Sequence, residues 1–96
     1  MKHSNDLSLG EAIKEFLQVY RLEDKLNETR IMKAWEKVLG KMVANHSRDL
    51  YIRNRVLHVK IDSAALRNEL SYSKEKIVKA LNKEVKAEVI EDVVFN

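Results

Sequence analysis

The stretch DLYIRNRVLHVKI, residues 49–61, decides the fold, because apolar and polar residues alternate along it with the two-residue period of a β-strand. One face of each half is apolar, carrying Leu50 and Ile52 and then Leu57, Val59 and Ile61. Between the halves, Asn54 is the residue best able to adopt the left-handed conformation of a tight turn. The stretch therefore predicts a β-hairpin that turns at Arg53-Asn54-Arg55.

Upstream of the hairpin, apolar residues recur with the spacing of amphipathic helices. The first set is Leu9, Ile13, Phe16, Leu17 and Tyr20. At the start of this set, Ser8 and Glu11 have the spacing of a capping box. A second set runs from Ile31 to Val43 and predicts a helix that ends at Gly40 or continues to about Asn45. The charged residues 21–27 between the two helices end in Asn27, which is suited to capping the helix that follows. They are interpreted as a connection that could contain a turn of helix.

Downstream of the hairpin, Asp62 and Ser63 offer an N-cap for a long third helix. One side of that helix is marked by Leu66, Leu70, Ile77, Leu81 and Val85. Ser71-Tyr72-Ser73 weakens the helix and could divide it in two. Residues 89–95 are rich in β-branched side chains and predict a closing strand.

The predicted order is helix, helix, strand, strand, helix, strand. Such an order predicts an α+β domain of two layers, in which a three-stranded sheet packs against helices. Ninety-six residues are enough for one core and too few for two. We therefore expect an N-terminal tail over residues 1–7 and a single domain over residues 8–96.

The composition bears on the class of function. The chain has no cysteine, which excludes a disulfide framework and a thiolate zinc site. Its three histidines lack metal-ligand spacing, and two glycines thirty residues apart cannot build a phosphate-binding loop. No apolar run approaches the length of a membrane span, and no signal segment is present, so a cytoplasmic protein is expected. We predict no enzyme activity, no metal or cofactor, no small-molecule substrate and no membrane association, and therefore a function in binding.

The charge is unevenly distributed along the chain. Residues 41–87 contain eleven lysines and arginines against five aspartates and glutamates, a net charge of +6, whereas residues 1–40 are neutral and residues 88–96 carry −3. This asymmetry favours a polyanionic partner.

The third helix concentrates this basic charge on one side. At 100° per residue, one narrow arc contains Tyr72, Lys76, Lys79, Lys83 and Lys86. Apolar residues such as Ile77 and Leu81 fall opposite this arc. Lysines at that spacing could contact successive backbone phosphates, and the tyrosine could stack on a base. The alternative interpretation is that the lysines only keep an exposed helix soluble.

The hairpin adds Arg53 and Arg55 at its turn and Lys60 on the outward face of its second strand. These cations could straddle phosphates, or could simply protect a sheet edge. Since the hairpin and the third helix are adjacent in the chain, the two could present one continuous surface. Of the aromatic residues nearby, Tyr51 is expected to be exposed and Trp35 to be buried.

Short motifs along the chain carry a family resemblance. They are Trp35-Glu36-Lys37-Val38-Leu39-Gly40, Met42-Val43-Ala44-Asn45-His46-Ser47, Leu50-Tyr51-Ile52, Leu57-His58-Val59 and Ala65-Leu66-Arg67-Asn68-Glu69-Leu70. Together they resemble the DciA family of bacterial proteins, whose members are associated with loading or operating the replicative helicase. The most specific part is Trp-x-x-x-x-Gly followed by Ala-x-His-Ser.

The resemblance implies a KH-like domain that binds nucleic acid and contacts the helicase ring when replication starts. The predicted order of helices and strands is compatible with that fold. The Gly-x-x-Gly loop by which typical KH domains clamp a nucleic-acid backbone is absent from this sequence, so that mode of contact does not carry over. The hairpin turn also has Asn54-Arg55 where a glycine is expected in many relatives.

Three functions are compatible with these observations. The favoured one is a non-enzymatic accessory protein that binds single-stranded or forked DNA through the residues named above and assists helicase loading. The second is a protein-interaction module that meets a helicase or another partner through its helices. The third is RNA binding, because a KH-like fold serves either nucleic acid.

Overall fold

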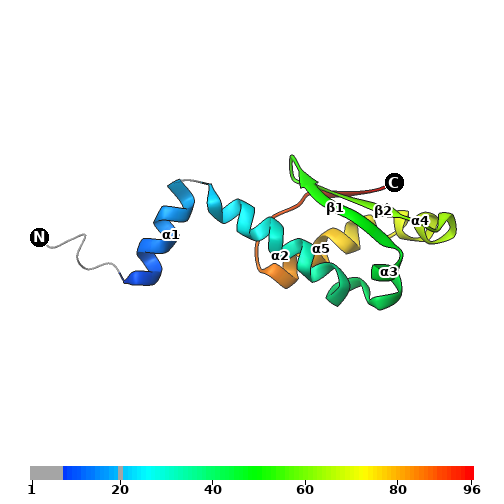
Figure 1. Ribbon diagram of the computed structural model, residues 1–96, viewed down its shortest axis with the longest axis horizontal. Coiled ribbons are helices and arrows are strands. Elements are labelled where there is room, and N and C mark those ends of the chain that lie inside the picture. The colour runs from blue at the N-terminus through cyan, green and yellow to red at the C-terminus, as the bar shows by residue number, and fades with distance from the viewer. Residues whose placement is uncertain (1–7, 20) are drawn as a thin grey trace, which may run out of the picture.

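The computed structural model describes residues 8–19 and 21–96 and confirms the α+β architecture (Figure 1). The helices are α1 (Leu9–Val19), α2 (Leu22–Leu39), α3 (Lys41–Asn45), α4 (Ala64–Ser71) and α5 (Lys74–Val85). The strands are β1 (Ser47–Arg53), β2 (Val56–Ile61) and β3 (Asp92–Phe95). The predicted tail, residues 1–7, and Tyr20 of the first apolar set lie outside the described residues.

The three strands form one mixed sheet in the order β1-β2-β3. β1 and β2 pair antiparallel through the predicted hairpin, whereas β2 and β3 pair parallel. Parallel pairing requires a crossover connection, which α4 and α5 provide. α2 and α5 pack side by side on one face of the sheet (Figure 1). The domain therefore has one helical layer and one open sheet face.

The core lies between this sheet and the two helices. The fully buried large side chains are Ile31, Leu57, Val59, Leu81, Ile90 and Val93. Trp35 of α2 is 3% exposed and lies 6.2 Å, between ring centroids, from Phe95 of β3. The alternating apolar positions of residues 57–61 all face this core, which confirms the apolar face predicted for the second strand of the hairpin.

The first helix begins as its sequence predicts. The Ser8 backbone N–H donates to Glu11 Oε1, and the Glu11 N–H donates to Ser8 Oγ, each at 3.1 Å. These two bonds form the predicted capping box. α1 then projects beyond the sheet (Figure 1), and the molecule measures 62 × 21 × 20 Å.

The prediction of a connection over residues 21–27 is wrong, because α2 begins at Leu22. Arg21, with a φ of 58°, directly precedes α2. The glutamate, lysine and leucine of this segment are strong helix formers, and its charged side chains remain in solvent on a helix. Asn27, expected to cap a later helix, instead accepts a hydrogen bond from Arg30 Nη1 at 3.1 Å within α2.

Gly40 ends α2, and a short separate helix, α3, follows it directly. Gly40 has a φ of 92°, a backbone conformation that residues with a side chain rarely adopt. A Cβ atom at this position would meet no atom within 4 Å. Backbone conformation and not space therefore requires glycine at this position.

The long third helix is divided, as the Ser71-Tyr72-Ser73 segment suggests. α4 is capped at Ser63, whose Oγ accepts from the Leu66 N–H at 3.2 Å, and it ends at Ser71. The Ser71 hydroxyl donates to the Asn68 carbonyl at 2.6 Å, a local bond that competes with helix continuation. α5 then begins after Ser73.

The closing strand is shorter than the predicted residues 89–95, because the buried Asn82 takes the hydrogen bonds of the preceding segment. Asn82 Oδ1 accepts from the N–H groups of Val89 and Ile90 at 3.0 and 3.1 Å, and its Nδ2 donates to the Ile90 carbonyl at 2.8 Å. These backbone groups are therefore satisfied by a side chain, and sheet pairing begins only at Asp92.

Replacing Asn82 with alanine is expected to lower the free energy of unfolding by about 2–4 kcal/mol, because buried backbone groups lose their partners and unsatisfied groups are costly. Urea denaturation followed by circular dichroism measures this change. The exposed Asn68→Ala change in α4 is the control and should shift stability by less than about 1 kcal/mol. An Asn82→Ala protein as stable as the control variant would contradict this role.

Candidate nucleic-acid interface

The basic side of α5 is the first part of the candidate interface. Lys76, Lys79 and Lys83 are exposed on the side of α5 opposite the buried Ile77 and Leu81. Lys86 follows as the C-cap, with a φ of 58°. We call Lys76, Lys79, Lys83 and Lys86 the lysine row. No carboxylate of residues 8–19 or 21–96 lies within 4.0 Å of these ammonium nitrogens.

The C-terminal part of the lysine row surrounds an open depression of about 480 Å³. Its lining residues are Lys79, Asn82, Lys83, Lys86, Ala87 and Glu88. Three ammonium groups thus border one site, which concentrates positive potential there. Glu88 adds one negative charge at its rim.

Tyr72 does not belong to the helix that carries the lysine row. It is the C-cap of α4, with a φ of −82°, and its N–H bonds back to the Glu69 carbonyl at 3.2 Å. The side chain is 81% exposed at the junction before α5. The break at Ser73 therefore removes Tyr72 from the continuous arc that the sequence suggested, while leaving its ring accessible.

Arg55 is held by the segment that follows the lysine row. Its Nη2 donates to the Glu88 carbonyl at 3.1 Å, and its Nε lies 3.6 Å from Glu91 Oε1. Both turn residues are left-handed, with a φ of 52° at Asn54 and 66° at Arg55, which explains why glycine is favoured in such a turn. The left-handed conformation costs an ordinary residue about 1–2 kcal/mol, and the contacts of Arg55 offset part of this cost.

Arg53 and Lys60 are exposed on the opposite side of the domain. Along β2, Leu57, Val59 and Ile61 face the helices, so Lys60 points from the open sheet face. Arg53 lies on the same face of β1, two residues beyond the exposed Tyr51. The lysine row points away from the sheet, so the structure places it and these two cations on opposite faces.

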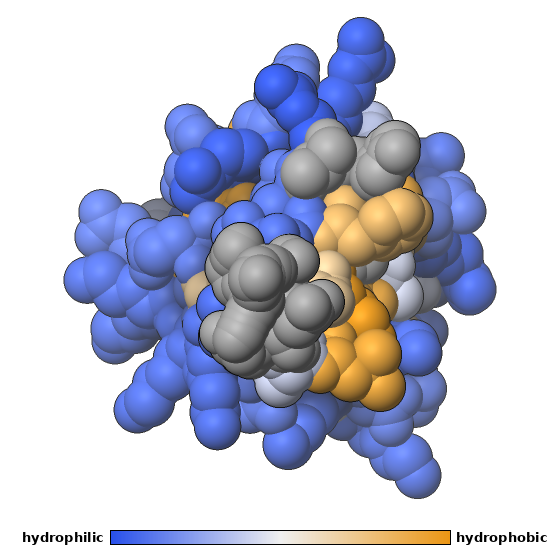
Figure 2. Space-filling model, turned by 90° about the vertical axis from the view of Figure 1, so that its left-hand side faces the viewer, coloured by the Kyte–Doolittle hydropathy of each residue, from blue (hydrophilic) through white to orange (hydrophobic). Residues whose placement is uncertain are grey.

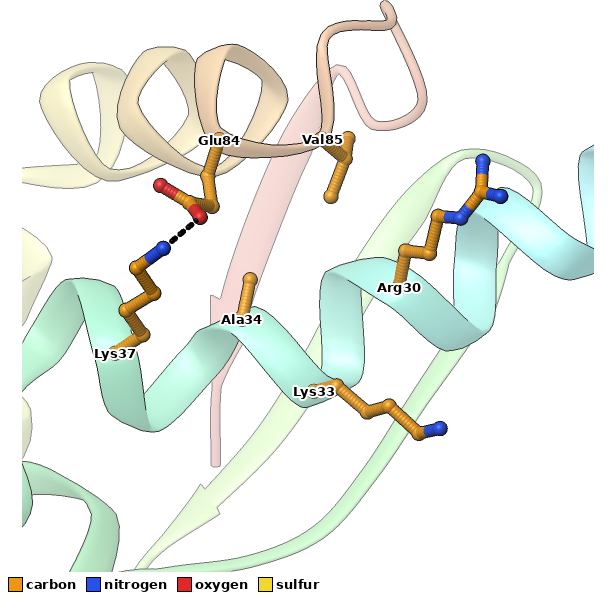
Figure 3. Close-up of a pocket in the computed structure, with 6 residues that line it drawn as sticks. All are labelled: Arg30, Lys33, Ala34, Lys37, Glu84 and Val85. Atoms are coloured by element: carbon orange, nitrogen blue, oxygen red, sulfur yellow. Dashed lines mark hydrogen bonds and ion pairs between the residues drawn. The ribbon is translucent and has the colours of Figure 1, made fainter.

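The structure adds basic residues of α2 that the sequence interpretation missed. Arg30, Lys33 and Lys37 line a groove of about 400 Å³ between α2 and α5, together with Ala34 of α2 and Val85 of α5 (Figure 3). Residues 1–40 have no net charge, which hid these cations in a linear count. Their spacing of three and four residues was the available signal, because it places them on one helix face.

Lys37 also changes the electrostatics of α5. Its Nζ lies 2.6 Å from Glu84 Oε2, and Figure 3 shows the two side chains reaching across the groove toward each other. Since Lys37 neutralises Glu84, this carboxylate offsets the field of the lysine row less than its place in the sequence suggests.

The remaining titratable cluster has a structural role. Asp62 accepts hydrogen bonds from His46 Nδ1 at 2.6 Å and Arg48 Nη2 at 3.2 Å. The hydrogen bond from His46, with a smaller contribution from the charge of Arg48, holds the pKa of Asp62 below its ordinary value. Within the part of the chain that the structure describes, no three histidine, aspartate or glutamate side chains meet as a metal site. None of the described helices is long and apolar enough to cross a membrane.

The elements from α1 to β3, including the lysine row and the exposed cations of the hairpin, lie within one family match. The family model described as "Dna[CI] antecedent, DciA" matches residues 8–95. The chain belongs to the DciA family. A comparison with curated proteins gave no significant match. Membership in DciA, a family related to helicase loaders and not a known enzyme family, supports an accessory role in DNA replication.

The most specific DciA motif in this chain is structural. Trp35 Nε1 donates to Ser47 Oγ at 2.9 Å, and the Ser47 hydroxyl donates to the Val43 carbonyl at 2.6 Å. Gly40 supplies the positive φ between α2 and α3. The motif residues thus fix the corner where α2, α3 and β1 meet, which leaves the exposed cations as the candidates for function.

Proposed function

We propose that this protein is a non-enzymatic accessory factor of DNA replication that binds single-stranded or forked DNA and assists loading of the replicative helicase. The lysine row carries the proposal, because its four exposed ammonium groups have no carboxylate within 4.0 Å in the described ranges 8–19 and 21–96. Membership in the DciA family supplies the context of replication.

The chemistry of the lysine row suits a phosphate backbone. Unpaired lysines on a helix contact phosphates as point charges and release condensed counterions, a contribution that does not depend on sequence. Successive members of the row are three or four residues apart, so they follow one another along the helix. The lysine row therefore favours DNA binding that does not depend on base sequence. A replication factor that acts at every fork needs binding of this kind.

A second candidate, a protein-interaction module, is favoured by exposed apolar side chains at the other end of the molecule. On α1 and the start of α2, Leu9 is 78% exposed, Ile13 50%, Phe16 55%, Leu22 40% and Leu26 41%. Figure 2 looks at this end and shows apolar side chains gathered within a hydrophilic surround. Contiguous exposed apolar patches of this kind commonly mark contacts with other proteins.

The experiment that tests the proposal measures helicase loading on a labelled DNA fork, with the replicative helicase of the same organism. We expect the protein to increase the rate of fork unwinding after helicase and fork are mixed. A protein in which the lysine row is changed to glutamine should lose this stimulation, whereas Lys14→Gln in α1 should keep it. A helicase complex that is stable at high salt, with stimulation unaffected by the lysine changes, would favour the interaction module instead.

A further inference from the structure

The open sheet face carries a pair of aromatic side chains that lies apart from the lysine row. Tyr51 of β1 and His58 of β2 lie directly opposite each other in the antiparallel ladder. Their ring centroids are 4.5 Å apart and their planes differ by 4°, so the two rings are stacked. We call this pair the sheet platform. Tyr51 is 50% exposed, so the stacked pair is accessible from solvent.

We propose that the sheet platform is a second contact site for single-stranded DNA, at which an unpaired base extends the stack of Tyr51 and His58. This inference rests on the proposed DNA-binding function and assigns it a site separate from the lysine row. A nucleobase is an aromatic plane, and stacking on protein rings is the usual way in which sequence-tolerant proteins hold unpaired bases.

The charges around the sheet platform fit a nucleic-acid strand. Arg53 lies two residues beyond Tyr51 on the same face of β1, and Lys60 lies two residues beyond His58 on the same face of β2. A cation therefore stands on each side of the stacked rings, where the phosphates flanking a stacked base would lie. Neither cation has a carboxylate within 4.0 Å in residues 8–19 and 21–96.

A depression beside the rings supplies polar groups for the edge of a base. It measures about 310 Å³ and is lined by Asp49, Tyr51, His58, Val59, Lys60 and Asn96. Ligand clefts span roughly 300–1,000 Å³, so this depression has room for one aromatic heterocycle. The Asp49 carboxylate would repel a phosphate but can accept a hydrogen bond from an N–H group at the edge of a base, such as N3–H of thymine. The depression is thus suited to a base, with the phosphates outside it near Arg53 and Lys60.

The backbone next to the sheet platform has an irregular conformation. The ladder between β1 and β2 shifts register between Arg48 and Tyr51, and Asp49 has a φ of 53°. Such bulges bend a strand and turn the side chains at the bulge in a new direction. Here the bulge brings Asp49 to the wall of the depression beside Tyr51.

The test measures binding of a fluorescently labelled thymidine oligonucleotide and of the same oligonucleotide made with abasic sites. For the wild type, we expect removal of the bases to weaken binding about tenfold, the effect of losing one stacked base. Tyr51→Ala should weaken binding of the normal oligonucleotide by a similar factor and should not change binding of the abasic one. Tyr51→Phe, which keeps the ring, should bind as the wild type does. Thermal melting checks that each variant is folded.

The outcomes separate this inference from the function on which it rests. If the wild type binds the oligonucleotide and Tyr51→Ala binds it equally well, the sheet platform is not a base-binding site, although the proposed function stands. If Tyr51→Ala weakens the binding of both oligonucleotides equally, the tyrosine contacts the DNA backbone or supports the fold, and the inference is overturned. If the wild type binds neither oligonucleotide at low salt, both the inference and the proposed function fail.

Discussion

Changing Lys76, Lys79, Lys83 and Lys86 to glutamate is expected to abolish binding to single-stranded and forked DNA while leaving the domain folded. Each change replaces an attractive contact with a phosphate by a repulsive one. The fold should survive because all four side chains are exposed and none makes an ion pair with another described residue. Fluorescence anisotropy of labelled DNA measures the binding, and circular dichroism measures the folding.

The control for this experiment changes the net charge by the same amount elsewhere. Lys14 of α1, Arg21 before α2, Lys25 of α2 and Lys41 of α3 are exposed cations outside both the lysine row and the groove between α2 and α5. Their change to glutamate should weaken binding through the overall charge but leave it measurable. Loss of binding that is equal in the two quadruple variants would show that net charge, and not the lysine row, attracts the DNA.

Replacing Trp35 with alanine is expected to lower the free energy of unfolding by about 3–5 kcal/mol, the cost of removing a large buried aromatic side chain. The indole is 3% exposed, packs near Phe95 and donates to Ser47 Oγ. Since small domains have a total stability of about 5–15 kcal/mol, this change would remove much of it. Urea denaturation followed by circular dichroism measures the effect, because the chain has no other tryptophan to report fluorescence.

Two further variants divide the contribution of Trp35. Trp35→Phe keeps an aromatic ring in the core and loses the hydrogen bond, so it should cost less than Trp35→Ala. Ser47→Ala removes the acceptor and should leave the indole N–H unsatisfied, at a cost of about 1–3 kcal/mol. A Trp35→Ala protein with unchanged stability would contradict the structural role of the family motif.

The hairpin and the main helices could be predicted because each depends on local periodicity. The alternation of residues 49–61 sets one register, and that register buries Leu57, Val59 and Ile61. The capping box at Ser8 and the N-cap at Ser63 also act over three residues, so both appear in the sequence and in the structure. Features that depend on residues close together in the sequence can therefore be predicted from the sequence.

Asn82 could not be predicted, because its role depends on contacts made by the folded chain. In the sequence it is one polar residue among the lysines and glutamates of α5. Only the turn after α5 brings the Val89 and Ile90 backbone to its side-chain amide. The length of β3 depends on that contact, which explains why the closing strand was predicted too long.

The candidate site was predictable in composition and less so in arrangement. Helical periodicity placed Lys76, Lys79 and Lys83 together, but the break at Ser73 moved Tyr72 to another element. Lys60 lies close to α5 in the sequence, yet the pleat of β2 turns it to the other face. Arrangement depends on how the layers pack, and a count of charges along the chain contains no information on that packing.

The central claim, that this protein binds DNA through unpaired lysines, is tested most directly by measuring the affinity for a single-stranded oligonucleotide across a salt series. The four phosphate contacts of the lysine row predict that the logarithm of the association constant falls with the logarithm of salt concentration with a slope of about −3, which contacts at Arg53 and Lys60 would make steeper. The charge-reversed lysine row should show no binding at any salt concentration. Absence of wild-type binding at low salt, or an affinity that does not change with salt, would contradict the claim.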